Sequence, residues 1–183
     1  SRDYFDATNE GQVNVTIAER QPGSSIKPLM YATTFQNKTL NPGTVLLDKP
    51  TCFNIPGQKP YCPKNYDGTF KGPVAIRKCL GNSLNIPAVK SLKTIGVVPF
   101  IKQASKMGIT SWTDYSRYGL SLTLGGGEVK MIDMAQAYST LANQGVKVPL
   151  TSIVEINDYK GELIEKNDFK QRLTDLDYLT TYD

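Results

Sequence analysis

Ser24 and Lys27 are the residues whose types and spacing best suit covalent chemistry. The 183-residue chain has no histidine, which excludes a Ser-His-Asp triad, a Cys-His pair and histidine-ligated metal sites. A nucleophilic serine then needs another base, and a lysine serves where burial or a nearby cation lowers its pKa. Three positions apart on a helix, the two side chains would share one face, with Cβ atoms about 5–6 Å apart. By spacing alone, a helix cap and a solvated lysine explain the pair better.

The segment from Ser24 to about Gln36 must position this pair. It is predicted to be a helix because apolar residues recur at helical spacing, namely Ile26, Leu29, Met30, Ala32 and Phe35. Ser24 is at the expected N-cap position, and Pro28 is tolerated only in a first turn, so the helix should begin close to Ser24. The positive end of the helix would favour a developing alkoxide on Ser24, whose backbone N–H could contact an oxyanion.

A second polar pair, Ser83 and Asn85, separates two further predicted helices. These helices cover residues 73–82, opened by Pro73, and residues 86–95. In an extended connector, residues two positions apart point to the same side, so both side chains could enter one site. The alternative is an inter-helix turn whose polar side chains cap the following helix.

The other segments are predicted to be mainly helical, with a few short strands. A half-buried strand is expected over residues 12–18, where Val13, Val15 and Ile17 alternate with polar side chains. The remaining elements are an irregular surface segment over 40–72, a helix over 99–106 closed by Gly108, a turn-rich connection over 119–127, a helix over 128–143 ended by Gly145, a hairpin over 151–157 and 162–166, and the opening of a further helix at the end of the chain. Three strands are too few to cover so many helices, so we expect an α+β fold with an incomplete sheet.

Composition and charge are those of a globular protein. Hydrophobic residues make up 39% and charged residues 21%, so disorder is not expected as the main state. The net charge of +4 comes without a run of five or six like charges, so no nucleic-acid-binding arm is predicted. No stretch approaches the roughly 20 apolar residues of a membrane-spanning helix.

The three cysteines are Cys52, Cys62 and Cys79. Cys52 and Cys62 flank a loop rich in proline and glycine, so a disulfide between them is plausible, and it would indicate an oxidising compartment. Three unpaired small hydrophobic residues are the equally weighted alternative. Without histidine, three thiols make a poor zinc site.

Three ordered blocks resemble the transpeptidase domain of class A penicillin-binding proteins, in the serine DD-transpeptidase and β-lactamase-like superfamily. The blocks are QPGSSIKP at 21–28; NYDG at 65–68, GPV at 72–74 and SLNIPAV at 83–89; and LGGGEV at 124–129 with MAQAY at 134–138. They follow the family's order and cover about residues 20–145. The resemblance implies a β-lactamase/transpeptidase-like α+β fold, of which this chain holds mainly the helical part.

The resemblance also implies a role for each candidate residue. Ser24 would attack the carbonyl of a peptide ending in D-Ala-D-Ala and form an acyl-enzyme, and Lys27 would take its proton. Ser83 would relay a proton to the departing amine. Asn85 would orient Lys27 and hydrogen-bond the substrate amide. The implied enzyme is a serine-type D-Ala-D-Ala transpeptidase or carboxypeptidase that cross-links peptidoglycan without a cofactor or a metal ion.

Two other functions remain open. A β-lactam-hydrolysing enzyme would use the same nucleophile but would need a carboxylate or modified lysine to activate water for deacylation. A non-catalytic penicillin-binding-like scaffold or sensor would need none of this chemistry, although the intact residues Ser24, Lys27, Ser83 and Asn85 argue against loss of activity in the parent protein.

The family's third motif, Lys-Thr-Gly or Lys-Ser-Gly on a sheet strand, does not occur in the sequence. We therefore expect residues 1–183 to be an incomplete transpeptidase domain that lacks its N-terminal strands and its C-terminal Lys-Thr-Gly strand. Alone it should be weak or inactive. The implied parent is a bifunctional protein whose glycosyltransferase domain and membrane anchor are not part of this chain.

The expected partners also follow from the resemblance. They are peptidoglycan stem peptides, β-lactam antibiotics and the remaining C-terminal fragment of the same domain. No nucleic acid is expected, and contact with a membrane is expected only through the parent's anchor. The implied location is extracytoplasmic, at the cell surface or in the periplasm, with the parent anchored in the bacterial plasma membrane.

Overall fold

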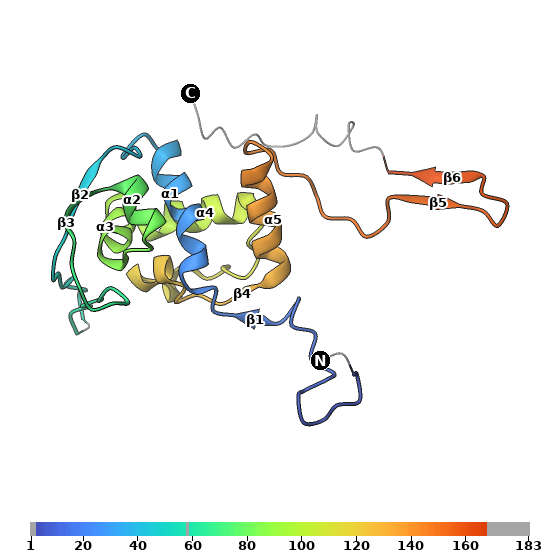
Figure 1. Ribbon diagram of the computed structural model, residues 1–183, viewed down its shortest axis with the longest axis horizontal. Helices are drawn as coiled ribbons and strands as arrows, with labels where there is room; N and C mark the ends of the chain where they lie inside the picture. Colours follow the sequence, from blue (N-terminus) through green and yellow to red (C-terminus); the bar gives the residue numbers. More distant parts are fainter. Residues whose placement is uncertain (1–2, 58, 168–183) are drawn as a thin grey trace.

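Five α-helices form the body of this computed structural model, which describes residues 3–57 and 59–167 (Figure 1). They are α1 (Lys27–Gln36), α2 (Ile76–Gly81), α3 (Asn85–Ile95), α4 (Val97–Met107) and α5 (Met131–Ala142). Three short 3-10 helices accompany them, η1 (Gly23–Ile26), η2 (Tyr115–Arg117) and η3 (Leu120–Leu124). In the view of Figure 1, α1 lies between α3 and α5, and it packs against α3 and α4.

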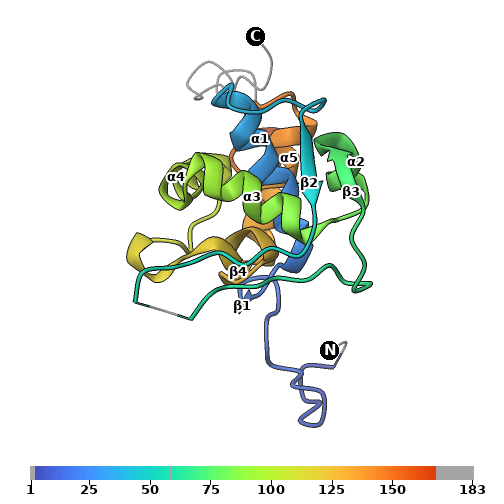
Figure 2. The same cartoon turned by 90° about the vertical axis from the view of Figure 1, so that its left-hand side faces the viewer.

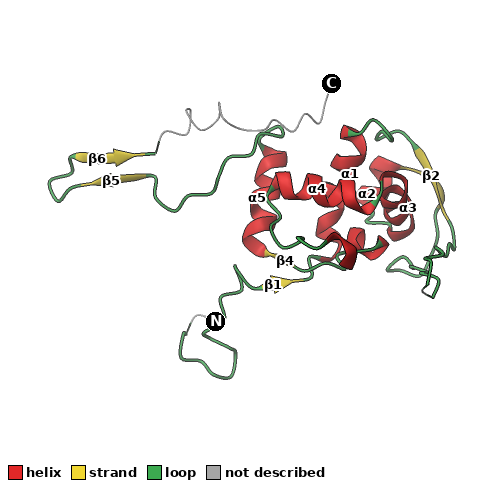
Figure 3. Ribbon diagram, turned by 180° about the vertical axis from the view of Figure 1, so that it is seen from behind, coloured by secondary structure: helices red, strands yellow, loops and turns green. Residues whose placement is uncertain are grey.

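The strands of the described residues are short and pair only two by two. The antiparallel pairs are β1 (Glu19–Arg20) with β4 (Val129–Lys130), β2 (Val45–Asp48) with β3 (Gly72–Ala75), and β5 (Glu155–Asn157) with β6 (Leu163–Lys166). The β2–β3 ribbon lies outside α2 and α3 and faces the viewer in Figure 2. The β5–β6 hairpin projects away from the helices (Figure 3). The predicted α+β fold with few strands and an incomplete sheet is confirmed.

The core forms around η1 and α1. The side chains of these two elements with 0–1% exposure include Ile26, Leu29, Met30 and Tyr31. They pack with buried side chains of the neighbouring helices, among them Leu92, Phe100, Ile101 and Ala137. Burial of each large apolar side chain contributes roughly 1.5–3 kcal/mol. The segment that carries Ser24 and Lys27 is therefore anchored in the hydrophobic core.

The strand predicted over residues 12–18 is wrong. This segment forms turns, in which the amides of Ile17 and Ala18 both donate to the carbonyl of Asn14. The alternating residues Val13 and Val15 are 39% and 51% exposed. Alternation produces a strand only where a partner strand covers one face, and no described strand pairs with this segment.

Two predicted helix starts are also wrong, each because a strand comes first. Pro73 lies in β3, and the helix begins only at Ile76. A two-stranded ribbon tolerates proline because each strand has an unpaired edge. Val129 lies in β4, and α5 begins at Met131. The segment 40–72, predicted to be irregular, likewise contributes β2 as the partner of β3.

The other helix predictions and the hairpin prediction are confirmed within a few residues. Helix α4 ends before Gly108, which adopts a φ of 125°. The strands β5 and β6 form the predicted hairpin. The helix expected at the end of the chain lies outside the described residues. Across residues 3–57 and 59–167, no helix combines the length and apolar character needed to span a membrane.

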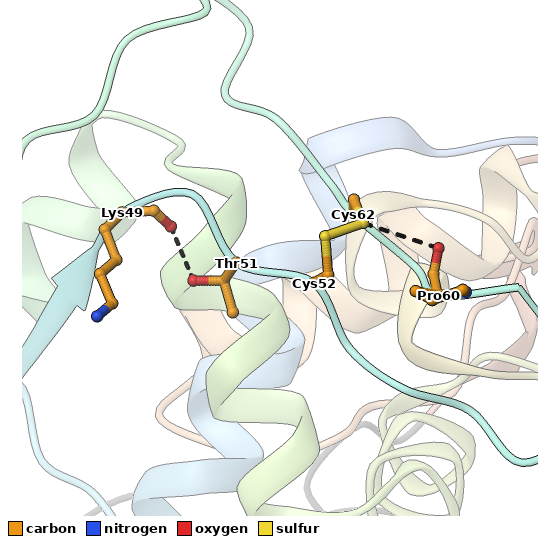
Figure 4. The surroundings of a disulfide bond; sticks show 5 residues. All are labelled: Lys49, Thr51, Cys52, Pro60 and Cys62. Atoms are coloured by element: carbon orange, nitrogen blue, oxygen red, sulfur yellow. Dashed lines mark hydrogen bonds between the residues drawn. A yellow bond between two sulfur atoms is a disulfide. The ribbon is translucent and has the colours of Figure 1, made fainter.

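The structure contains the Cys52–Cys62 disulfide (Figure 4). The thiol of Cys79 is free and buried. Beside the disulfide, Phe53 and Tyr61 exchange backbone hydrogen bonds of 2.8 and 2.9 Å. Of the two alternatives left open by the sequence, the bridged one is therefore confirmed. The bridge closes the base of a loop directly before the segment that carries Asn65.

Candidate active site

Ser24 and Lys27 lie one turn apart at the junction of η1 and α1. Ser24 is exposed on η1, and Lys27 is the first residue of α1 with 0% exposure. In a 3-10 turn, side chains three positions apart are eclipsed, so the local geometry is compatible with the predicted sharing of one face. The N-cap of η1 is Pro22, so the prediction that Ser24 caps the helix is wrong.

The third sequence block holds this turn in place. A Cβ atom added to Gly125 would lie 2.2 Å from the backbone nitrogen of Gly23, so only a glycine permits this approach of η3 to η1. From α5, the hydroxyl of Tyr138 donates to the carbonyl of Ser25 at 2.8 Å. Two elements distant in sequence therefore fix the backbone around Ser24.

The ammonium group of Lys27 is held by three hydrogen bonds. It donates to the backbone oxygen of Ser83 at 2.6 Å, to Ser83 Oγ at 3.1 Å and to Asn85 Oδ1 at 2.7 Å. Burial disfavours the charged form and lowers the pKa of Lys27 from 10.5 to about 8. Roughly a tenth of the lysine is then neutral at pH 7. The structure thus brings together Lys27, Ser83 and Asn85, as the sequence predicted.

Ser83 and Asn85 converge through a tight turn and not through an extended connector. Ser83 adopts a left-handed φ of 51°, which costs an L-residue on the order of 1–2 kcal/mol. The amide of the next residue, Leu84, bonds to the carbonyl of Cys79, and α3 begins at Asn85. The N-cap of α3 is Leu84, with no side-chain cap, so the capping alternative is not borne out.

Sequence reasoning missed two neighbours that support Asn85. The backbone N–H of Asn85 donates to Asn65 Oδ1 at 2.7 Å, and Asn85 Nδ2 donates to the carbonyl of Lys64 at 2.7 Å. Asn65 is only 5% exposed. The signal that could have identified it was the NYDG block, which has no apolar periodicity of its own.

A cleft of about 500 Å³ lies beside these residues. It is lined by Ser24, Ser83 and Asn85 together with residues 65–67 and Lys71. The Lys71 ammonium pairs with Asp67 at 2.9 Å, and hydrogen bonds from Lys71 and Thr69 hold the pKa of Asp67 well below its usual range. Nowhere in the described part of the chain do three Cys, Asp or Glu side chains gather as a metal site. The arrangement offers a hydroxyl, a lysine of lowered pKa and two polar side chains at one cleft.

Comparison with known proteins gives consistent matches over most of the chain. Residues 3–176 match the family model of the penicillin binding protein transpeptidase domain. Penicillin-binding protein 2D of Bacillus subtilis is 36% identical over 172 residues, which are 91% of this chain and 23% of that protein. Penicillin-binding protein 1B of Haemophilus influenzae is 32% identical over 154 residues, 83% of this chain and 19% of that protein. The chain therefore spans about a fifth of the length of these relatives.

The fold comparison agrees. The crystal structure of penicillin-binding protein 1A from Haemophilus influenzae superposes with a TM-score of 0.78 at 30% identity, over 90% of this chain and 24% of that chain. The predicted transpeptidase-like fold is thereby confirmed. Since the family model covers nearly the whole sequence and the matched relatives are penicillin-binding proteins, this chain belongs to the transpeptidase domain family of the class A penicillin-binding proteins.

Proposed function

We propose that this chain supplies the nucleophile and base of a serine D-Ala-D-Ala transpeptidase that cross-links peptidoglycan and is acylated by β-lactams. The observation that carries the proposal is the position of Lys27. Its amine is buried and bonded to Ser83 and Asn85, and these two residues line the cleft together with the exposed Ser24, one turn before Lys27.

In the acylation step, neutral Lys27 takes the proton of Ser24 while Ser24 Oγ bonds to the carbonyl carbon of the penultimate D-Ala. The resulting ammonium returns a proton through Ser83 Oγ, at 3.1 Å from Lys27 Nζ, to the amine of the departing D-Ala as the C–N bond breaks. Attack of an acceptor amine on the ester then releases Ser24 and forms the cross-link. No net proton is gained or lost over the cycle.

Asn85 has two tasks in this proposal. Its Oδ1 holds the Lys27 amine, and its Nδ2 is held in turn by Lys64. An amide carries two N–H donors and two acceptor lone pairs, so one of each remains for the substrate. This leaves room for the hydrogen bond to the substrate amide that the family resemblance implies.

The oxyanion that forms on the substrate needs donors beyond these residues. The Ser24 backbone N–H is one candidate, and the missing Lys-Thr-Gly motif would supply the other from elsewhere. We therefore propose that residues 1–183 act within a larger transpeptidase domain and are weak or inactive alone. For the whole protein we propose a bifunctional, membrane-anchored enzyme that acts outside the cytoplasm.

The test is covalent labelling of the full-length protein that contains these residues. Fluorescent penicillin should label the wild type at Ser24, as read by mass spectrometry of the labelled peptide. Ser24→Ala should abolish labelling, whereas Ser25→Ala, the neighbouring exposed serine, should retain it. Labelling that survives Ser24→Ala would contradict the proposal. Sustained hydrolysis of nitrocefin would point to a β-lactamase, because a transpeptidase reacts once and stalls.

A further inference from the structure

A chain of hydrogen bonds, buried at its β2 end, runs from β2 to the candidate active site. It begins at Asp48, the last residue of β2, which has 0% exposure and does not line the cleft. It passes through Asn65 to Asn85 and ends at Lys27. Neither Asp48 nor Asn65 was expected to act in the site. Asp48 lies in a segment without a recognisable pattern, and no role was predicted for Asn65 in the NYDG block.

Asp48 determines which way the Asn65 amide points. Its carboxylate accepts from Asn65 Nδ2 at 3.0 and 2.8 Å, and from the backbone N–H of Lys71 at 2.9 Å. An ionised carboxylate only accepts hydrogen bonds, so the amino side of Asn65 must face it. Asp48 interacts electrostatically with Lys90, and its charge contributes to the raised pKa of the Cys79 thiol.

With the amide so oriented, Asn65 Oδ1 faces Asn85. It accepts the backbone N–H of Asn85 at 2.7 Å, while Asn65 Nδ2 makes an additional bond to the carbonyl of Thr69 at 2.9 Å. A flipped amide would place two donors against each other at Asn85. An unsatisfied donor in a site this buried costs about 1–3 kcal/mol, so the observed orientation is strongly preferred.

We propose that Asp48 and Asn65 are positioning residues that hold Asn85 Oδ1 against the amine of Lys27, an inference that rests on the proposed function. Asn85 is fixed at its backbone N–H by Asn65 and at Nδ2 by Lys64, which leaves Oδ1 directed at Lys27. The long Lys27 side chain is thereby kept in one rotamer, close to Ser83 and one turn from Ser24.

A positioning role of Asp48 and Asn65 should change the pH dependence of acylation, which a merely stabilising role would not change. The hydrogen bond from Lys27 to Asn85 Oδ1 favours the charged form of the lysine. If Asn85 loses its orientation, Lys27 becomes a weaker base in a poorer position. The maximal acylation rate should fall, and the pH at which acylation reaches half its maximum should move to lower values.

The experiment measures acylation by fluorescent penicillin between pH 6 and 10 in the full-length protein. Asp48→Asn and Asn65→Ala should each slow acylation at the pH plateau about 10- to 100-fold, as expected for misplacement of a reacting group. Both should also lower the pH midpoint. In the Asn65→Ala background, Asp48→Asn should cause no further loss of rate, because Asp48 acts through Asn65.

Asp133→Asn is the matched control. Asp133 is a carboxylate with 7% exposure that accepts from the N–H and hydroxyl of Thr110 and does not line the cleft. It should lower the unfolding temperature without moving the pH midpoint. If Asp48→Asn does not fold, Asn65→Ala carries the same comparison.

The outcomes separate the two proposals. Wild-type protein that is not labelled at Ser24 overturns the proposed function. Wild-type labelling at Ser24 together with unchanged plateau rates and pH midpoints in Asp48→Asn and Asn65→Ala overturns the positioning role alone.

Discussion

The inner wall and the rim of the cleft use the same residue types in opposite surroundings. The inner wall comprises the cleft-lining residues Ser24 and 83–85 with the buried residues that support them, among them Lys27 and Gly125, and the rim comprises the loop 66–71. Lys27 on the inner wall has 0% exposure and three hydrogen bonds to the turn between α2 and α3. Lys71 on the rim has a side chain that is 46% exposed and pairs with Asp67. Burial lowers the pKa of Lys27 to about 8 and makes it a usable base, whereas the amine of Lys71 stays in contact with solvent and is paired with a carboxylate.

The glycines of the two regions differ in the same way. Gly125 approaches the backbone of Gly23 and has no room for a side chain, whereas nothing lies within 4 Å of a Cβ atom added to Gly68. Both have a positive φ. The comparison teaches that the inner wall is determined by packing with distant segments and the rim mainly by its own local turn.

The largest expected effect separates the two lysines. Lys27→Ala should slow acylation of Ser24 about 10²–10⁴-fold, the usual contribution of a general base. Lys71→Ala should change the rate only slightly, because an exposed ion pair is well screened. Stopped-flow acylation by a fluorescent penicillin gives both numbers. Equal losses in the two variants would show that the buried lysine has no special role.

A pair of glycine substitutions tests the packing difference. Gly125→Ala should lower the free energy of unfolding by about 3 kcal/mol or more, because η1 and η3 must separate. At Gly68 an added methyl group has space, so Gly68→Ala is disfavoured only by the φ of 68°. It should lower the free energy of unfolding by about 1–2 kcal/mol. Denaturant titration of the domain measures the difference. Similar values for both variants would mean that the contact of Gly125 with Gly23 is easily relaxed.

Removing the Cys52–Cys62 disulfide should destabilise the segment that leads into the rim. Cys52 and Cys62 are 10 residues apart, and closure of a loop of this size stabilises a domain by about 2–3 kcal/mol. The double variant Cys52→Ser/Cys62→Ser should lose that amount and acylate more slowly, since Lys64 follows the bridge directly. Reductant should reproduce the loss in the wild type and leave the double variant unaffected. A wild type that is insensitive to reductant would speak against this role.

The smallest expected effect is the change in acylation rate per unit of pH. The folded-state pKa of Lys27 is depressed to about 8, so the neutral base accumulates as the pH rises towards this value. Below it, acylation should fall about tenfold per pH unit. Lys71→Ala should leave the midpoint in place. A profile that is flat from pH 6 to 9 would exclude a titrating lysine base.

Much of the candidate site could be predicted from local sequence. The absence of histidine left lysine as the available base, but the spacing of Ser24 and Lys27 alone favoured a helix cap and a solvated lysine. The sequence blocks that resemble the transpeptidase family indicated the serine–lysine pair and its neighbours in the SLN segment. Short polar segments next to proline and glycine kept their predicted positions because local turns depend on nearby residues. In the site, the predicted N-cap role of Ser24 and the extended connector between Ser83 and Asn85 were wrong. In the fold, the failures were strands. In residues 12–18 apolar and polar side chains alternate, but no described strand pairs with this segment. Pro73 lies in a strand because β2 pairs with it.

The sequence by itself determined the chemistry that this protein can attempt, because residue types and short spacings limit which bases and nucleophiles are available. Only the tertiary structure decided that Lys27 is buried and that Asp48 reaches the site through Asn65. Burial and hydrogen bonding between segments far apart in the chain depend on how those segments pack. A carboxylate in an irregular stretch therefore carries no local sign of the asparagine that it orients.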